Sequence, residues 1–296
     1  KRAVVLGEIT KDTEVFAIAG THGKTTTASF LTHLFAHLNL EFTAFLGGIM
    51  NDYQSNLVQR GKRYSIVEAD EYDRSFLQLF PDFACVTAMD ADHLDIYGNH
   101  ENMKKAFDQF SKLVKQKVVV ASEVDLEGYC YALEEKAHYY AQAIRVEDQG
   151  YRFDLVTPTQ IHKDVYLKAM GRHNLSNAIG AVAVLDVGGF PLEKALPALG
   201  NFKGIQRRME VFSLENKVVI DDYAHHPEEI KAVLKTIFEF YPNKRNMVVF
   251  QPHLFSRTQD FMEDFVQVLS KFDEIVLMDI YPAREQPIAG SLRMLC

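Results

Sequence analysis

A short run near the start of the chain, Ala19-Gly-Thr-His-Gly-Lys-Thr-Thr-Thr27, limits the possible folds more than any other segment. It follows a stretch with the composition of a buried strand, residues 15–19, and it opens a stretch with the period of a helix, residues 25–38. Glycines in such a turn let the main chain approach an anion, and the N–H groups at the helix start point toward it. The alternative is a glycine-rich turn that only packs. The sequence predicts a phosphate-binding loop in an α/β fold.

The expected loop differs from the common Gly-x-x-x-x-Gly-Lys-Ser/Thr pattern, because Ile18 takes the place of the first glycine and the loop opens at Gly20. Lys24 is expected to reach the β- and γ-phosphates of a nucleotide, and the Thr25 hydroxyl is expected to bind magnesium. The residues expected to contact the nucleotide here are Gly20, Thr21, His22, Gly23, Lys24, Thr25 and Thr26.

Strand-like and helix-like stretches alternate along the chain, which predicts a mostly parallel sheet covered by helices. We expect a P-loop-type α/β domain over residues 1–202 with a small antiparallel appendage at 139–168, and a second, incomplete Rossmann-like domain over 203–296. Further strands are expected at 64–68, 83–88, 117–121, 218–222, 247–251 and 274–279, and further helices at 101–114, 174–185, 228–240 and 259–269.

Composition excludes several other classes. The 32 Lys and Arg residues against 40 Asp and Glu give a net charge of −8, which disfavours a sequence-independent grip on nucleic acid. The three cysteines are unclustered, so neither a disulfide framework nor a zinc site is expected. No apolar run is long enough to span a membrane, and the first residues do not form a signal peptide. We therefore expect a cytoplasmic protein that binds neither nucleic acid nor membrane.

Acidic residues and a histidine follow two further strands. Glu68 ends one, and the run Asp90-Ala-Asp-His-Leu-Asp95 follows another. Ligands of parallel sheets bind beyond the carboxyl ends of the strands, so Lys24, Glu68 and His93 are expected to surround one metal–phosphate site. Taken singly, the acidic segment around Glu68 could be a solvated loop, and His93 could be a packed or capping residue.

Other polar groups lie at predicted helix starts and strand ends. His173, Asn174 and Asn177 begin a helix, where Asn174 could simply be the N-cap. The remaining groups are Arg207-Arg208 at the predicted domain boundary, Asp221-Asp-Tyr-Ala-His-His-Pro227, and Gln251-Pro-His-Leu-Phe-Ser-Arg-Thr258. Arginine suits phosphates and carboxylates, because its guanidinium binds two oxygens at once.

Together these motifs resemble the ATP-dependent Mur ligases of bacterial peptidoglycan synthesis. The blocks that carry the resemblance stand in the family's order over nearly the whole chain: Gly20–Thr27, Glu68-Ala-Asp-Glu71, Asp90–Asp95, Gly171-Arg-His-Asn174, Arg207-Arg208, Asp221–Pro227 and Tyr281-Pro-Ala-Arg-Glu-Gln-Pro287. The pattern is most similar to the branch that joins L-alanine to UDP-N-acetylmuramate. The resemblance implies that ATP phosphorylates the lactyl carboxylate of that substrate, and that the amine of L-alanine attacks the acyl phosphate.

The resemblance also implies roles for individual residues. Thr25 and Glu68 would bind one magnesium, and Glu68 with His93 a second, while Lys24 holds the phosphates. His173, Asn174 and Asn177 would face the base, and Arg207 or Arg208 with Asp221 or Asp222 would close over ATP from the second domain. The amino-acid pocket would consist of Tyr223, His225, His253 and Arg257. Catalysis would rest on Lys24, Glu68, His93, His225 and Arg257.

Two departures from the family pattern stand out. Leu254 occupies a position that is commonly arginine, and the family's N-terminal UDP-binding domain, of roughly a hundred residues, is not recognisable. The sequence therefore reads as a central domain plus part of a C-terminal domain. Two alternatives stay open: a murein peptide ligase that attaches a tripeptide, and a P-loop ATP-binding module without ligase activity.

Overall fold

The computed structural model describes residues 2–90, 97, 99–283 and 285–286, and the chain divides into two units, Lys1–Glu210 and Val211–Cys296. The first unit therefore ends later than the boundary expected after residue 202. The reason is that the segment 203–210 is hydrogen-bonded to strand β2 (Phe42–Met50) of the first unit. Ile205 forms a bridge with Met50, and the Gln206 N–H donates to the carbonyl of Ile49 over 2.9 Å.

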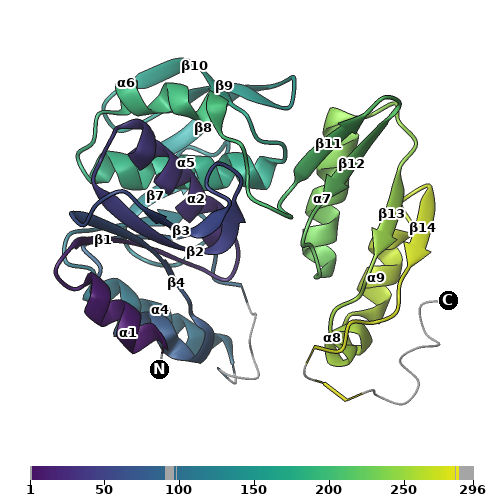
Figure 1. Cartoon of the computed structure of the whole chain (residues 1–296), viewed down its shortest axis with the longest axis horizontal. Helices are drawn as coiled ribbons and strands as arrows, with labels where there is room; N and C mark the ends of the chain where they lie inside the picture. Colours follow the sequence, from purple (N-terminus) through teal and green to yellow (C-terminus); the bar gives the residue numbers. More distant parts are fainter. Residues whose placement is uncertain (1, 91–96, 98, 284, 287–296) are drawn as a thin grey trace. The chain divides into compact units, whose positions relative to one another are not determined.

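One mixed sheet organises the first unit (Figure 1). Its strand order is β10-β9-β8-β7-β6-β5-β1-β4-β2-β3. The strands besides β2 are β1 (Glu14–Ala19), β3 (Ser55–Gln59), β4 (Tyr64–Ala69), β5 (Phe83–Val86), β6 (Lys117–Ala121), β7 (Tyr129–Ala132), β8 (Tyr139–Glu147), β9 (Gly150–Val156) and β10 (Ile161–Leu167). The strands from β2 across to β8 pair in parallel, so the prediction of a mostly parallel sheet is confirmed.

The register of the central strands brings their carboxyl ends together. Strand β1 lies between β4 and β5, and Ala19 is opposite both Ala69 and Val86. Every residue of β1 after Glu14 is buried. The loops that follow these three strands therefore leave the sheet at one edge, which is where parallel sheets bind their ligands.

Helices cover both faces of this sheet. Figure 1 shows α2 and α5 on one face and α1 and α4 on the other. The bounds are α1 (Arg2–Thr10), α2 (Lys24–His37), the 3-10 helix η1 (Tyr72–Gln78), α4 (His100–Leu113), α5 (Arg172–Val187), α6 (Leu192–Ala195) and the 3-10 helix η2 (Leu196–Asn201). Among the described residues, no helix combines the length and the apolar character that crossing a bilayer requires.

The expected antiparallel appendage is present but is not a separate sheet. Strands β8, β9 and β10 pair antiparallel with one another, while β8 also pairs in parallel with β7 and extends the main sheet. Strands β2, β3 and β7 were not predicted. Strand β2 contains Gly47 and Gly48, and glycine weakens the strand signal of a sequence.

The second unit contains two pairs of strands, β11 (Glu210–Leu214) with β12 (Lys217–Asp221), and β13 (Met247–Phe250) with β14 (Glu274–Leu277). Its helices are α7 (Pro227–Phe240), α8 (Phe255–Asp260) and α9 (Met262–Leu269). The helix predicted at 259–269 is thus two helices, interrupted at Phe261, whose φ is −111°. Strand β11 was not predicted.

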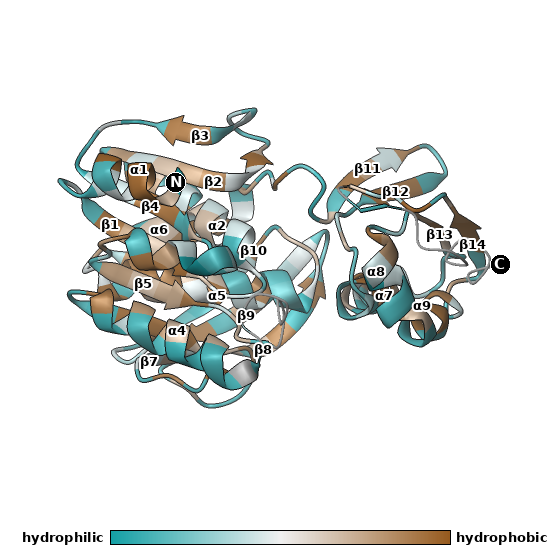
Figure 2. Cartoon of the chain, turned by 90° about the horizontal axis from the view of Figure 1, so that it is seen from below, coloured by the Kyte–Doolittle hydropathy of each residue, from teal (hydrophilic) through white to brown (hydrophobic). Residues whose placement is uncertain are grey.

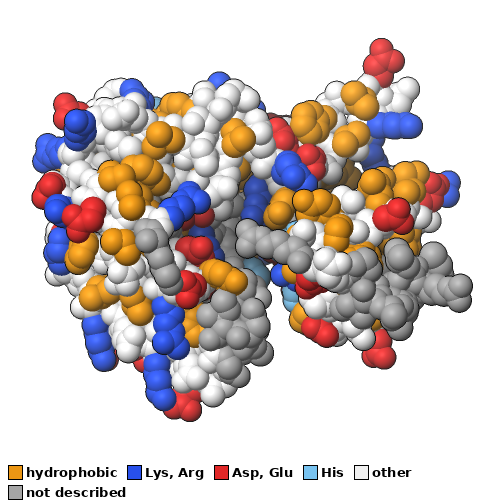
Figure 3. Space-filling model, turned by 60° about the horizontal axis from the view of Figure 1, so that its bottom comes forward, with side chains coloured by type: hydrophobic (Ala, Val, Ile, Leu, Met, Phe, Trp, Pro, Cys, Tyr) orange, Lys and Arg blue, Asp and Glu red, His pale blue; other side chains and the backbone are white. Residues whose placement is uncertain are grey.

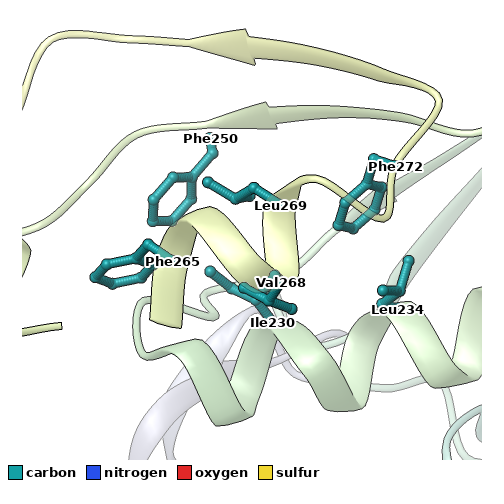
Figure 4. Packing of buried hydrophobic residues seen from close by; sticks show 7 residues of the cluster. All are labelled: Ile230, Leu234, Phe250, Phe265, Val268, Leu269 and Phe272. Carbon is teal, nitrogen blue, oxygen red and sulfur yellow. The ribbon is translucent and has the colours of Figure 1, made fainter. Parts of the chain in front are cut away.

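The second unit has a small core of its own (Figure 4). It consists of Ile230, Leu234, Phe250, Phe265, Val268, Leu269 and Phe272. Strands β13 and β14 are strongly apolar (Figure 2), yet of their residues the core contains Phe250, with Val248 and Leu277 packed against it. Met247 and Val249 of β13 are more than half exposed, as is Met278 directly after β14, and Figure 3 shows apolar side chains at the surface of this unit. Among the described residues, the helices therefore cover one side of the β13–β14 pair.

Candidate functional site

The loop of residues 20–23 joins β1 to α2 and is fixed to the end of β5. Gly20 and Gly23 have φ of +134° and +79°, values that side chains rarely adopt. A Cβ at Gly20 would lie 2.3 Å from the Thr87 hydroxyl, and the Thr21 N–H donates to the carbonyl of Ala88 over 3.1 Å. Both glycines are thus required by the backbone path, as a phosphate loop needs.

Lys24 is the first residue of α2, and its side chain folds back over the loop. Its Nζ donates to the Gly20 carbonyl over 2.6 Å and to both carboxylate oxygens of Glu71, over 2.7 and 3.0 Å. Glu71 follows the end of β4, and its side chain is 1% exposed. Glu71 stands in the acidic block Glu68–Glu71, whose pattern alone indicates no role for it, and only the β1–β4 pairing brings it to the lysine.

Glu68, near the end of β4, lies against Thr25. The Thr25 hydroxyl donates to Glu68 Oε2 over 3.0 Å, and the Gly47 N–H donates to Oε1. Burial raises the pKa of this carboxyl above its ordinary value, opposed by these two hydrogen bonds and by the charges of Lys24 and Arg208. A Cβ at Gly47 would lie 2.7 Å from Glu68 Oε2 and 3.0 Å from Thr25 Oγ1. The end of β2 thus leaves room for the carboxylate only because residue 47 is glycine.

The oxygens of Thr25 and Glu68 are of the kind that magnesium prefers. Their spacing brings together two of the three predicted metal ligands. The third, His93, lies outside the described residues. Within those residues, no group of three or more His, Cys, Asp or Glu side chains is arranged as a metal site, so the donor set here is one carboxylate and one hydroxyl.

The loop after β5 also contacts the phosphate loop. The Asp90 N–H donates to the Thr21 hydroxyl over 3.1 Å, and the Asp90 carboxylate lies 3.8 Å from Nε2 of His22. The Thr87 hydroxyl is within hydrogen-bond distance of the carbonyl oxygens of Ala19 and His22. The segments after β1, β4 and β5 thus lie close together, as predicted, and for the segment after β5 this holds up to Asp90, the last described residue before the gap at 91–96.

The start of α5 approaches the same loop. A Cβ at Gly23 would lie 2.5 Å from Oδ1 of Asn177, so this buried amide is adjacent to the loop. Asn174 is not the N-cap: Gly171 occupies that position, and the Asn174 amide donates to the carbonyl of Met170 over 2.7 Å. His173 is exposed.

Arg207 and Arg208 belong to the first unit rather than to the second. The charge of Arg208 is close enough to Glu68 to lower the pKa of that carboxyl. Arg207 and Met209 have φ of +58° and +47°, and the Arg207 N–H donates to Glu210 over 3.0 Å. The connecting segment is thus tightly folded where it leaves the first unit.

The second unit brings the predicted amino-acid pocket residues together. The rings of Tyr223 and His225 are 5.2 Å apart, and those of His225 and His253 are 5.8 Å apart. His225 Nδ1 lies 2.8 Å from the Tyr223 carbonyl, and a carbonyl only accepts, so Nδ1 carries the proton and Nε2 stays available. His253 stacks on Tyr281 with 5.5 Å between ring centroids.

Two buried nitrogens in this cluster have no hydrogen-bond partner among the described residues. In the part of the chain that the structure describes, the buried side-chain atoms without a hydrogen bond include His253 Nδ1 and Arg257 Nη1. Burial lowers the pKa of His253, and the charges of His225 and Arg257 lower it further, against the opposite effect of Glu285. Buried polar atoms are normally satisfied, so a ligand with oxygen acceptors suits this place.

Further hydrogen bonds hold the backbone around these residues. Leu254 has a φ of +72° and donates its N–H to the carbonyl of Tyr281 over 2.9 Å. Glu285 accepts from the N–H of Ser256 over 3.0 Å and from its hydroxyl. Asp222 forms a local turn by accepting from the Ala224 N–H over 2.7 Å, while Asp221 is exposed at the end of β12. Glu285 is a second residue to which the sequence analysis gave no role.

His226 has a structural role. It is the N-cap of α7, and it forms a capping box with Glu229. Glu229 Oε2 accepts the N–H groups of His225 and His226 over 2.9 and 3.2 Å. Glu229 of the capping box thus also fixes the backbone of His225. His226 caps the helix, whereas His225 belongs to the predicted amino-acid pocket.

Comparison with known proteins matches both units to one family. Residues 18–185 match the Mur ligase middle domain, and residues 207–293 match the Mur ligase glutamate ligase domain. A UDP-N-acetylmuramate–L-alanine ligase from Flavobacterium johnsoniae is 51% identical over 98% of this chain, which spans 65% of that protein.

Solved structures give the same result. A UDP-N-acetylmuramate–alanine ligase from Thermotoga maritima superimposes with a TM-score of 0.83 at 30% identity, covering 95% of this chain and 64% of that one. A murein peptide ligase from Psychrobacter arcticus shares the fold with a TM-score of 0.64 at 18% identity, over 94% of this chain and 76% of that one. The chain spans about two thirds of the relatives it matches, and the middle-domain match alone covers more than half of it. The chain belongs to the Mur ligase family.

Proposed function

We propose that this chain is the nucleotide- and amino-acid-binding part of an ATP-dependent ligase that joins L-alanine to UDP-N-acetylmuramate in peptidoglycan synthesis. The observation that carries the proposal is the Lys24–Thr25–Glu68 arrangement at the start of α2, with Thr25 Oγ1 and Glu68 Oε2 3.0 Å apart. Its support is the family membership and the 51% identity to a relative of that name.

In this proposal the loop binds the phosphates of ATP through its N–H groups and Lys24. Thr25 and Glu68 would hold magnesium, which, when bound, neutralises charge on the phosphoryl group being transferred. His93 would bind a second magnesium together with Glu68. Asn177, buried beside Gly23, is the best supported of the three residues proposed to face the base, the others being His173 and Asn174.

The reaction follows from these groups. A substrate carboxylate oxygen attacks the γ-phosphorus of ATP, ADP leaves, and an acyl phosphate forms. The amine of the amino acid then attacks the acyl carbon, phosphate leaves, and the amine proton passes to a base. Lys24 stabilises the developing charge on the phosphoryl oxygens.

The second unit would bind the amino acid. Arg257, with a buried unpartnered Nη1, is proposed to bind the α-carboxylate. Burial lowers the pKa of His253, which favours its neutral form, and the Nε2 atom of His225 would accept a proton from the attacking amine. Tyr223 would complete this pocket.

The test is a competition assay in the full-length protein that measures ADP release with UDP-N-acetylmuramate and each of L-alanine, glycine, L-serine and the stem tripeptide. L-Alanine should be preferred over glycine by about 1 kcal/mol, the value of one buried methyl group. Preference for the tripeptide would indicate a murein peptide ligase instead. ADP release that does not depend on any amine would indicate a nucleotide switch instead.

A further inference from the structure

The Lys24 ammonium is fully occupied by acceptors of the protein. Its Nζ contacts the Gly20 carbonyl at 2.6 Å and the two Glu71 carboxylate oxygens at 2.7 and 3.0 Å. A lysine ammonium has three N–H donors, so these three acceptors use all of them. A phosphate oxygen can therefore bind Nζ only by replacing one of these contacts.

Glu71 is held in place for this contact. Its carbonyl accepts from the buried Tyr97 hydroxyl over 2.5 Å and from the Arg74 N–H over 2.9 Å. The side chains of Lys24 and Glu71 are only 18% and 1% exposed. A charge-assisted contact that is shielded from water is much stronger than an exposed ion pair.

We propose that Glu71 competes with nucleotide phosphate for the Lys24 ammonium and thereby sets the affinity of the loop for ADP and ATP. This inference rests on the proposed function of the loop. It gives a role to Glu71, which has none in the proposed function. Of the three acceptor atoms, the Gly20 carbonyl oxygen is neutral and belongs to the loop itself, whereas the other two are the carboxylate oxygens of Glu71. An incoming phosphate therefore replaces the Glu71 oxygens.

The nucleotide series separates this role from a merely structural one. Lys24 is placed to reach the β- and γ-phosphates, so AMP has no phosphate that needs the ammonium. Glu71→Gln keeps the shape of the side chain and removes its charge. It should tighten the binding of ADP and ATP about tenfold, the lower end of what a hydrogen bond to a charged group contributes. The affinity for AMP should stay within about twofold, because the change acts only through Lys24.

The experiment is titration calorimetry of the chain with AMP, ADP and ATP in the presence of Mg²⁺. The matched control is Glu101→Gln, which removes the same charge from an exposed pair with Lys105, with side chains 75% and 62% exposed, and which should leave all three affinities unchanged. In a Lys24→Met background, Glu71→Gln should change none of them.

The possible outcomes are distinct. Unchanged or weaker ADP binding by Glu71→Gln overturns the inference, as does an equal gain for AMP or a gain that persists without Lys24. A wild-type chain that binds neither ADP nor ATP overturns the proposed function itself, and the inference with it. If Glu71→Gln does not fold, Glu71→Asp, which withdraws the carboxylate by one methylene, should bind ADP more tightly than wild type, and equal or weaker binding overturns the inference.

Discussion

Replacing Gly47 with alanine should damage the proposed magnesium site while leaving the fold almost intact. The added Cβ would lie 2.7 Å from Glu68 Oε2 and 3.0 Å from Thr25 Oγ1, where ordinary contacts begin at 3.4 Å. The carboxylate is the end of a flexible side chain, so it can move away. Moving it breaks the hydrogen bond from Thr25 and displaces the oxygen that accepts the Gly47 N–H.

The two consequences differ in size. A displaced Glu68 would no longer contact the bound ion, and a charge-assisted contact of this kind contributes about 1.5–3 kcal/mol, so its loss corresponds to a 10- to 100-fold decrease in Mg²⁺-dependent nucleotide affinity. Stability should change by less than about 1 kcal/mol, because Gly→Ala reduces the entropy of the unfolded chain and Glu68 gains hydration when it moves.

Calorimetric titration of ADP with and without Mg²⁺, together with thermal unfolding, measures both quantities; calorimetry suits a chain without tryptophan. Gly48→Ala is the matched control, because its Cβ would meet methyl groups of Ile205 and Thr25, both at 2.9 Å, and no carboxylate. It should lower stability and spare most of the Mg²⁺ effect. If Gly47→Ala keeps the full Mg²⁺-dependent gain in affinity, the argument about the carboxylate is wrong.

Four further substitutions test other parts of the proposal. Lys24→Ala in the full-length protein should raise the barrier to ADP production by on the order of 3 kcal/mol, because it removes a contact to the transferring phosphoryl group, and normal turnover would contradict the assignment. Glu68→Gln should stabilise the chain at neutral pH. Burial raises the folded-state pKa of Glu68, so wild type loses stability as the pH rises from 4.5 through the folded-state value, and a stability difference that does not grow over that range in denaturant titrations would refute this. Arg257→Ala should raise the KM for L-alanine, and Leu254→Arg should lower it by adding a second guanidinium; turnover curves that do not respond to Arg257→Ala would show that the carboxylate is bound elsewhere.

The sequence predicted the parts of the fold that local patterns determine. The strand ending at Ala19, the helix after it and the antiparallel strands from Tyr139 onward all have clear periods, and each is present. The β2 strand was missed because Gly47 and Gly48 interrupt its pattern. The same glycines are what allow β2 to pass beside Glu68 and Ile205, so the weak strand signal and the close approach have one cause.

The roles of Glu68 and Glu71 show what a local pattern cannot determine. The two carboxylates are three residues apart in one acidic run, and either could bind a cation. In the structure Glu68 accepts hydrogen bonds from a neutral N–H and a neutral hydroxyl, an arrangement in which its oxygens could bind a magnesium ion. Glu71 is paired directly with an ammonium. What separates them is the pairing of β4 with β1 on one side and β2 on the other. The contacts of Glu71 with Lys24 and of Glu68 with Thr25 join residues more than 40 positions apart, so the different roles of the two acids follow from tertiary structure and not from the local sequence.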